Sequence, residues 1–252
     1  MRGLASVLLV ALVVAAVAPP VAPAAAQESP RPDPESDRIG WENGYWHDDP
    51  VNVDQSDGLS DAELERYVAR ATARVEYLRE AEFDSSVPVS VIDRESYRNR
   101  SSGGGNESDD YNAWNNQVWE ALFIVGEDTD VGAELGSTYG SSVAGFYSPG
   151  DDEIKIITDD TDAPTINNAT LVHELVHALQ DQRYDLTRER YAGETQDTQL
   201  ATDGVVEGEA NYIEAQYRQR CASGEWDCVA TPPSAGGSSG DGPNLGILLT
   251  IL

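Results

Sequence analysis

Two histidines placed four residues apart constrain this chain more than any other feature of its sequence. His173 and His177 stand in a largely apolar stretch, Leu171 to Leu179, which predicts a buried helix. At this spacing both imidazoles lie on one face of the helix and can bind the same metal ion. Glu174 points to the side of that face, where its carboxylate reaches a water molecule on the metal and not the metal itself. The chain has three histidines in all, and buried histidines without partners are costly, so the pattern indicates a metal site.

A third protein ligand has to come from another part of the chain. The longer pattern, in which glycine and histidine follow the second histidine, is excluded because Gln180 and Arg183 occupy those positions. No histidine follows His177, so we expect the third ligand to be a carboxylate. A second helix, predicted from Thr198 to about Arg220, is the source of this carboxylate.

Two glutamates of that second helix are candidates, Glu207 and Glu209. Residues two apart on a helix project about 200° apart, so only one of them can reach the metal. Helical phase does not choose between them, because both flank the apolar stripe of the helix. That stripe consists of Val206, Ala210, Ile213 and Tyr217. Gly208, between the two glutamates, is expected to let this helix approach the first one closely.

The rest of the chain predicts an α+β fold in which a small strand layer precedes the two helices. Ser60 is a good helix N-cap, and apolar residues at spacings of three and four continue that helix to about Glu82. The turn residues Pro149 to Asp152 separate two short β-prone segments and indicate a hairpin. The other expected elements are a strand from Val87 to Ile92, a loop over residues 99–110, a helix from Tyr111 to about Ile124 with Trp114, Val118 and Leu122 inward, and hairpin strands Val143 to Ser148 and Glu153 to Thr158.

The charge of the chain excludes several classes of partner. It has 45 acidic residues against 16 Lys and Arg, a formal net charge of −29, and a single lysine, Lys155. Such a surface repels phosphate groups, which argues against nucleic acid and anionic membranes as partners. Because amphipathic segments are present, we expect a folded protein with an acidic surface, whose self-repulsion molar salt would screen within about 3 Å. This lysine-poor composition resembles that of proteins from extreme halophiles.

Residues 1–26 have the pattern of a secretory signal peptide. Arg2 precedes an apolar stretch, and small residues end at Ala26. We therefore expect a secreted or cell-surface protein with no membrane span once this segment is cleaved. Outside the cell, Cys221 and Cys228, which are the only cysteines, are expected to form a disulfide.

The remaining sequence divides into three predicted parts. Residues 27–58 form an acidic, Pro-rich linker and an aromatic segment around Trp41, which is expected to pack on the domain. Residues 59–230 form the metal-binding domain, and residues 231–252 combine a Gly/Ser-rich linker with an apolar end. This end is too short to span a bilayer. It fits either the start of an element that continues in a longer protein or a terminal element docked on the domain.

Three motifs together resemble the gluzincin branch of the zincin metallopeptidases. They are Ala144-Gly145-Phe146-Tyr147 in the hairpin, the H-E-L-V-H helix and the V-E-G-E-A sequence of the second helix, all between Val143 and Arg220. The acidic composition, the signal peptide and the G-W-E-N-G-Y-W segment further resemble surface proteins of halophilic archaea. The zincin resemblance implies a zinc ion held by His173, His177 and Glu207. It also implies that the strand near Phe146, or the next strand, pairs with an extended peptide substrate.

The function implied by this resemblance is that of an exported zinc-dependent metallopeptidase acting on a peptide or protein substrate. Zinc would activate a water molecule and polarise the scissile carbonyl, and Glu174 as general base would pass the water's proton to the leaving amine. The chain departs from the family because no downstream histidine is available to stabilise the oxyanion, so Tyr212 and Tyr217 are the candidates. Asp181, Asp185 and Asp203 are considered for orienting a ligating histidine, but in so acidic a chain we expect them to be solvated surface residues.

Two other functions stay open from the sequence. The first is a non-catalytic cell-surface protein that keeps the zinc site for stability or for binding. The second is an amidase or another hydrolase that acts on cell-envelope material.

Overall fold

The computed structural model describes residues 31–103, 109–193 and 195–230. The predicted signal peptide and the predicted C-terminal linker and apolar end lie outside these residues. Contacts divide the chain into Met1–Arg31 and a second unit that starts at Pro32, and the following description concerns the second unit. Helices and short strands are mixed along it, which confirms the predicted α+β class. Within the described ranges, no helix is long and apolar enough to cross a membrane.

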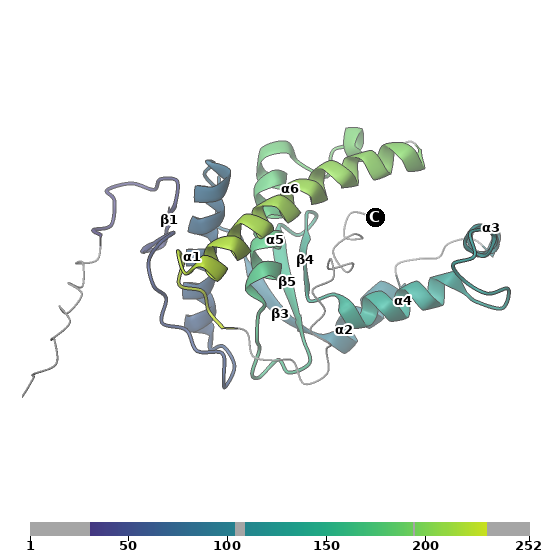
Figure 1. Cartoon of the computed structure of the whole chain (residues 1–252), viewed down its shortest axis with the longest axis horizontal. Helices are drawn as coiled ribbons and strands as arrows, with labels where there is room; N and C mark the ends of the chain where they lie inside the picture. The colour runs from purple at the N-terminus through teal and green to yellow at the C-terminus, as the bar shows by residue number, and fades with distance from the viewer. Residues whose placement is uncertain (1–30, 104–108, 194, 231–252) are drawn as a thin grey trace, which may run out of the picture. The chain divides into compact units, whose positions relative to one another are not determined.

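Five strands, arranged in a two-stranded and a three-stranded sheet, and six α-helices follow one another along the described chain (Figure 1). In order they are β1 (Trp41–Glu42), β2 (Tyr45–Trp46), α1 (Asp61–Arg79), β3 (Val89–Asp93), α2 (Arg94–Gly103), α3 (Asp109–Ala121), α4 (Val131–Ser142), β4 (Gly145–Ser148), β5 (Glu153–Thr158), α5 (Asn168–Tyr184), a 3₁₀ helix (Glu189–Tyr191) and α6 (Gln196–Ser223). The two histidines of the sequence motif therefore lie on α5, and both candidate glutamates lie on α6.

Three strands form the sheet that precedes α5. Its order is β3-β5-β4, with β3 parallel and β4 antiparallel to β5. The register pairs Val89 with Ile154 and Gly145 with Ile156. The predicted hairpin is present as β4–β5, and its turn residue Asp152 adopts a left-handed φ of 51°. Strand β4 lies at one edge of this sheet, and α5 packs against β4 and β5.

Helix α1 begins where the sequence predicts, because Ser60 and Glu63 form a reciprocal capping box. It ends at Arg79, slightly before the predicted end, since the next residue has a left-handed φ of 51°. The helix packs against α5 and α6. The aromatic segment forms the β1–β2 hairpin on α1, where His47 stacks on Tyr77 with ring centroids 3.7 Å apart. The prediction that this segment packs on the domain is confirmed.

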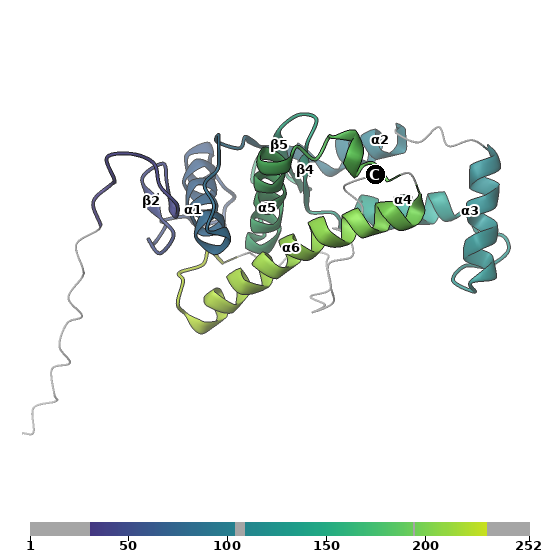
Figure 2. The same cartoon turned by 90° about the horizontal axis from the view of Figure 1, so that it is seen from above.

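Helix α5 packs against α1, α6 and the strands β4 and β5, and α6 crosses it (Figures 1 and 2). Asn167 caps its start by accepting hydrogen bonds from the backbone N–H groups of Ala169 and Thr170. Every residue from Ala169 to Asp181 is buried. A helix that is surrounded in this way must satisfy its polar side chains inside the fold. The polar residues of α5 therefore have to find their partners on neighbouring elements.

Helix α6 crosses α5 and α1 and buries its predicted apolar stripe (Figure 2). The stripe residues Val206, Ala210, Ile213 and Tyr217 are at most 8% exposed. Gly208 does not serve the close approach expected of it, because a Cβ atom at this position would meet no atom of the described chain within 4 Å. It lies on the exposed side of the helix, and the contact with α5 is made by the stripe.

A short loop after α6 is tied back to α1. Cys221 and Cys228 form a disulfide, with Cα atoms 5.6 Å apart. The guanidinium of Arg74 on α1 donates to the backbone oxygen of Asp227 and lies 4.6 Å from the ring centroid of Trp226. The C-terminal end of α6 is thereby held against α1.

Two helices were not predicted from the sequence. The first, α2, begins before the expected 99–110 loop and covers the start of it, up to Gly103. Asp93 caps this helix by accepting from the N–H of Ser96. The second, α4, contains three glycines, which lower helix propensity and explain why the pattern missed it. These helices support each other, because Arg98 of α2 donates to the backbone oxygen of Gly140 at 3.0 Å.

Helix α3 forms near the predicted range, but its predicted inward face is wrong. None of its residues is buried, and Trp114 is 51% exposed. Leu122, which follows the helix, is 62% exposed. The apolar spacing predicted the helix correctly and its environment wrongly, because spacing does not specify whether another element covers that face.

Candidate metal centre

Two helices bring three potential metal ligands together inside the fold. Helix α5 supplies His173 and His177, and α6 supplies Glu207; one ligand atom from each lies within 4.8 Å of the others. Nε2 of His173 is 3.2 Å from Oε2 of Glu207, and Nε2 of His177 is 3.5 Å from Oε1 of the same carboxylate. None of the three side chains belongs to a residue more than 5% exposed. These three residues are the ligand cluster.

Two buried atoms of the ligand cluster have no hydrogen-bond partner in the described part of the chain. They are Nε2 of His177 and Oε1 of Glu207. Leaving such an atom unpaired costs about 1–3 kcal/mol, whereas a cation between the two would coordinate both. Two imidazoles and one carboxylate are a donor set that holds zinc in hydrolytic enzymes. The ligand cluster therefore fits a divalent metal ion.

Without a metal, the electrostatics of the ligand cluster favour a proton on His173. Burial lowers the pKa of His173, but hydrogen bonds to Glu207 and Glu214 outweigh it and raise the pKa to about 9. Burial raises the pKa of Glu207, but the neighbouring imidazoles of His173 and His177 outweigh it and lower the pKa to about 2. A ligating histidine must offer an unprotonated nitrogen, so metal binding has to expel this proton.

Metal affinity is therefore expected to rise about tenfold per pH unit between pH 6.5 and pH 9, since His173 loses a proton on binding. Over the same window the metal-free protein is expected to lose stability. A histidine with a raised folded-state pKa stabilises the fold fully below its unfolded value of 6.5, and this contribution is lost as the pH rises through about 9. Zinc competition titrations measure how the affinity changes with pH. Thermal unfolding of the metal-free protein at the same pH values measures how its stability changes. A flat affinity across the window contradicts a protonated His173.

The tertiary structure separates the two candidate glutamates of α6. Glu207 is 5% exposed and belongs to the ligand cluster. Glu209 instead places Oε1 2.6 Å from Nη1 of Arg79, and its Oε2 accepts a hydrogen bond from Gln180 at 2.8 Å. Of the two, Glu207 is the one placed to complete a metal site with the histidines.

Each histidine is oriented at Nδ1 by a side chain that the sequence reasoning missed. Nδ1 of His173 is 3.1 Å from Oε2 of Glu214, and Nδ1 of His177 is 2.9 Å from Oε1 of Gln180. Such contacts fix the ring orientation and the tautomer of a ligating histidine. Helical spacing could have predicted both partners. Gln180 follows His177 by one turn of α5, and Glu214 follows Glu207 by two turns of α6, so each lies on the same helix face as a ligand.

The three aspartates considered for this orienting role do not contact the histidines. Asp181 accepts hydrogen bonds from the Tyr147 hydroxyl at 2.8 Å and from the backbone N–H of Leu186 at 2.6 Å. Asp185 lies beyond the end of α5 as its C-cap residue. Asp203 accepts from Gln199 one turn earlier on α6. They serve the end of α5 and the first turns of α6, and Asp181, at 8% exposed, is buried and not the solvated surface residue expected.

Glu174 lies beside the histidines in sequence and faces the edge strand β4. Its Oε2 accepts a hydrogen bond from the backbone N–H of Tyr147 at 2.9 Å, and the residue is 2% exposed. Because successive residues of a strand point their N–H groups to opposite sides, this N–H lies on the edge of β4 that does not pair with β5. Burial raises the pKa of Glu174, which makes the carboxylate a better proton acceptor.

The two tyrosines considered for oxyanion stabilisation are placed elsewhere. The hydroxyl of Tyr217 is 3.2 Å from Oδ1 of Asn168, at the start of α5, and accepts from Arg74. Tyr212 is 64% exposed on α6, whereas the ligand cluster is buried. Neither residue fills that role in this arrangement.

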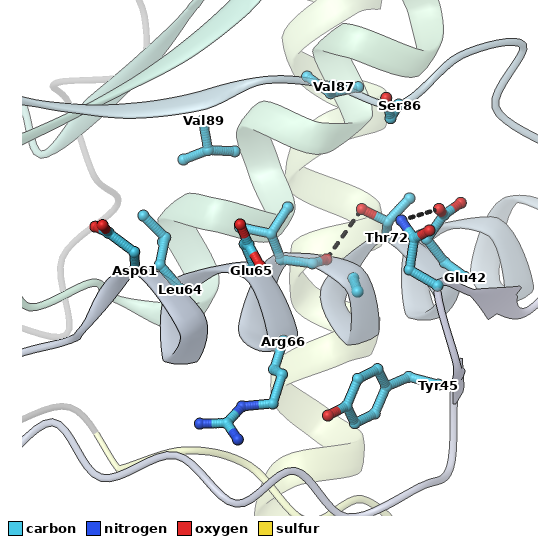
Figure 3. A pocket seen from close by; sticks show the side chains of 13 residues that line it. Glu42, Tyr45, Asp61, Leu64, Glu65, Arg66, Thr72, Ser86, Val87 and Val89 are labelled. Carbon is cyan, nitrogen blue, oxygen red and sulfur yellow. Dashed lines mark hydrogen bonds between the residues drawn. The ribbon is translucent and has the colours of Figure 1, made fainter.

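The ligand cluster lies apart from two large cavities of the described chain. One, of about 650 Å³, lies beside α1; Leu64 and Val89 line it from the helix and from β3 (Figure 3). The other has a volume of about 560 Å³ and lies between Tyr147 of β4 and the C-terminal end of α5. Four aspartates are part of its lining. Residues of the ligand cluster line neither cavity. The three residues are at most 5% exposed, so the centre is buried in this conformation.

Comparisons with known proteins add no assignment to this geometry. No family model, curated protein or solved structure matches this chain. A functional conclusion for this chain therefore has to come from the ligand cluster, Glu174 and the edge strand β4.

Proposed function

We propose that this protein is an exported zinc-dependent metallopeptidase with a zincin-like domain, adapted to high salt. The observation that carries the proposal is the convergence of two imidazoles and one carboxylate next to a glutamate that is not a ligand. Structural zinc sites usually have four protein ligands, whereas hydrolytic sites use three and leave one position for water or substrate. The ligand cluster has three. Export and salt adaptation rest on the signal-like segment and the net charge of −29.

The chemistry follows from the place of Glu174. Bound zinc would supply Lewis acidity towards the scissile carbonyl and towards water. Glu174 takes a proton from the attacking water and delivers it to the leaving amine. The N–H of Tyr147 holds one oxygen of this carboxylate at 2.9 Å, which fixes its direction and leaves its other oxygen for the proton.

The substrate class follows from the edge strand. Among the described residues, no strand pairs with β4 on the side that faces Glu174, and an extended peptide can add to such an edge through main-chain hydrogen bonds. A peptide bound along β4 would bring one of its amide groups next to the ligand cluster. Because the centre is buried in this conformation, substrate entry requires that the elements around it separate.

Burial is also the observation that favours the alternative function. A zinc ion at a buried centre would stabilise the fold by linking α5 to α6 without turning over substrate. In this case the chain would be a non-catalytic surface protein. The two functions make the same prediction for metal content and opposite predictions for hydrolysis.

The deciding experiment measures zinc and hydrolysis in the same preparation, purified in molar salt. We expect about one zinc per chain by elemental analysis, and cleavage of unstructured peptides that stops on chelation and returns with zinc. Zinc without cleavage of any peptide, together with a lower melting temperature after chelation, supports the non-catalytic alternative. A protein that takes up no zinc contradicts both.

A further inference from the structure

Four side chains, His177, Gln180, Glu209 and Arg79, contact one another in a row that we call the relay. It connects the second histidine of the ligand cluster to α1, a helix that carries no ligand. Nδ1 of His177 is 2.9 Å from Oε1 of Gln180, whose Nε2 donates to Oε2 of Glu209 at 2.8 Å. Oε1 of Glu209 lies 2.6 Å from Nη1 of Arg79. The relay starts on α5, passes through α6 and ends on α1. Gln180, in its middle, is 3% exposed.

The partners of Gln180 determine which way its amide points. Its nitrogen donates to the backbone oxygen of Val206 at 3.0 Å as well as to Glu209, and both of these groups only accept hydrogen bonds. A flipped amide would set an oxygen against two acceptors, so its carbonyl oxygen must face His177. Nδ1 of His177 then carries the hydrogen, and the lone pair of Nε2 is left for a metal ion.

The same amide also reaches the helix of the third ligand. Val206 and Glu209 stand on either side of Glu207 in the sequence of α6. Gln180 therefore holds the His177 ring with its oxygen and the segment around Glu207 with its nitrogen. Arg79 keeps the Glu209 carboxylate in place, and its side chain is 19% exposed, so this ion pair is partly shielded from solvent.

We propose that Gln180 is a positioning residue for the metal centre and that Arg79 acts on the centre through Glu209 and Gln180. This inference rests on the proposed metal site and does not require that the site be catalytic. His173 is oriented differently, because its partner Glu214 pairs with Arg218 of the same helix. The relay from Arg79 is thus the route by which α1, which supplies no ligand, contributes to metal binding.

A double-mutant cycle on zinc affinity tests the relay in the full chain, with a competing chelator as the probe. We expect Gln180→Ala to weaken zinc binding by about 10–100-fold and Arg79→Ala to weaken it less. The double variant should be no weaker than Gln180→Ala alone, because Arg79 acts through Gln180. Arg188→Ala is the matched control, since its ion pair with Asp185 lies on the exposed loop after α5.

Two further variants keep the test decisive if Gln180→Ala unfolds. Gln180→Met keeps the volume and loses the acceptor, and Gln180→Glu keeps an acceptor for His177. The glutamate variant should bind zinc more tightly than the methionine variant, while the melting temperatures of the metal-free variants need not follow that order. The absorption spectrum of the cobalt-loaded protein should change with Gln180→Met and not with Arg188→Ala.

Three results would overturn the inference. They are unchanged zinc affinity in a folded Gln180→Met variant, an Arg79→Ala effect that persists in full in the Gln180→Ala background, and equal affinities for the methionine and glutamate variants. Each of them requires that the wild type binds zinc. A wild type that binds none contradicts the metal site itself, whereas zinc binding without hydrolysis contradicts only the peptidase proposal and leaves the relay standing.

Discussion

Replacing Glu174 by glutamine is expected to lower peptide hydrolysis by about 10²–10⁴-fold, the usual contribution of a general base, while zinc content stays unchanged. Glutamine keeps the shape of the side chain and an oxygen that can accept from the Tyr147 N–H. It cannot take the proton of the attacking water. The ligand cluster does not include Glu174, so the metal remains bound. Turnover of a peptide substrate and zinc content of the same preparations measure the two effects.

The control for this variant is Glu189→Gln. Glu189 is an exposed carboxylate on the 3₁₀ helix after α5, so its change to an amide removes one charge without touching the centre. Its hydrolysis rate should equal that of the wild type. If Glu174→Gln retains the wild-type rate, Glu174 is not the general base. If both proteins bind zinc and neither cleaves peptide, the site is structural.

Replacing His177 by alanine is expected to remove zinc binding and with it the stabilisation that zinc provides. At a zinc concentration of about 1,000 times Kd, binding stabilises a protein by about 4 kcal/mol. For a domain of this size that corresponds to roughly 8–16 °C in melting temperature. The variant deletes one of the three ligands and leaves Glu207 without one of its two histidine neighbours. Thermal unfolding with and without zinc measures the loss directly.

The third histidine of the chain supplies the matched control. His47 stacks on Tyr77 of α1 and does not belong to the ligand cluster. His47→Ala removes an aromatic contact, so its melting temperature is expected to fall, but the increase on adding zinc should persist in full. If zinc raises the melting temperature of His177→Ala as much as that of the wild type, the metal binds elsewhere.

Local sequence patterns predicted the elements that build the centre. Ser60 and Glu63 form a capping box, and turn residues mark the β4–β5 hairpin; both signals depend on contacts over a few residues. The apolar residues around His173 predicted that α5 is buried, and the stripe on α6 predicted which of its faces packs inward. These features follow from helical and strand periodicity, which a sequence carries directly.

Other parts of the fold had no such local signal. Helix α4 is rich in glycine, and part of α2 resembles a loop in composition, so the pattern gave no reason to expect either. The parallel pairing of β3 with β5 joins strands about 60 residues apart, and nothing within either strand specifies this partner. The apolar spacing of α3 predicted a buried face where the structure leaves Trp114 half exposed.

The sequence by itself determined that two histidines on a buried helix would share one face and that a carboxylate from a later helix would join them. Only the tertiary structure decided that this carboxylate is Glu207, because Glu207 and Glu209 flank the same apolar stripe and differ only after α6 has rotated against α5. Arg79 then holds Glu209 from α1, a helix more than 100 residues earlier in the chain. Helical phase sets directions about an axis, whereas the position of that axis depends on packing between distant segments.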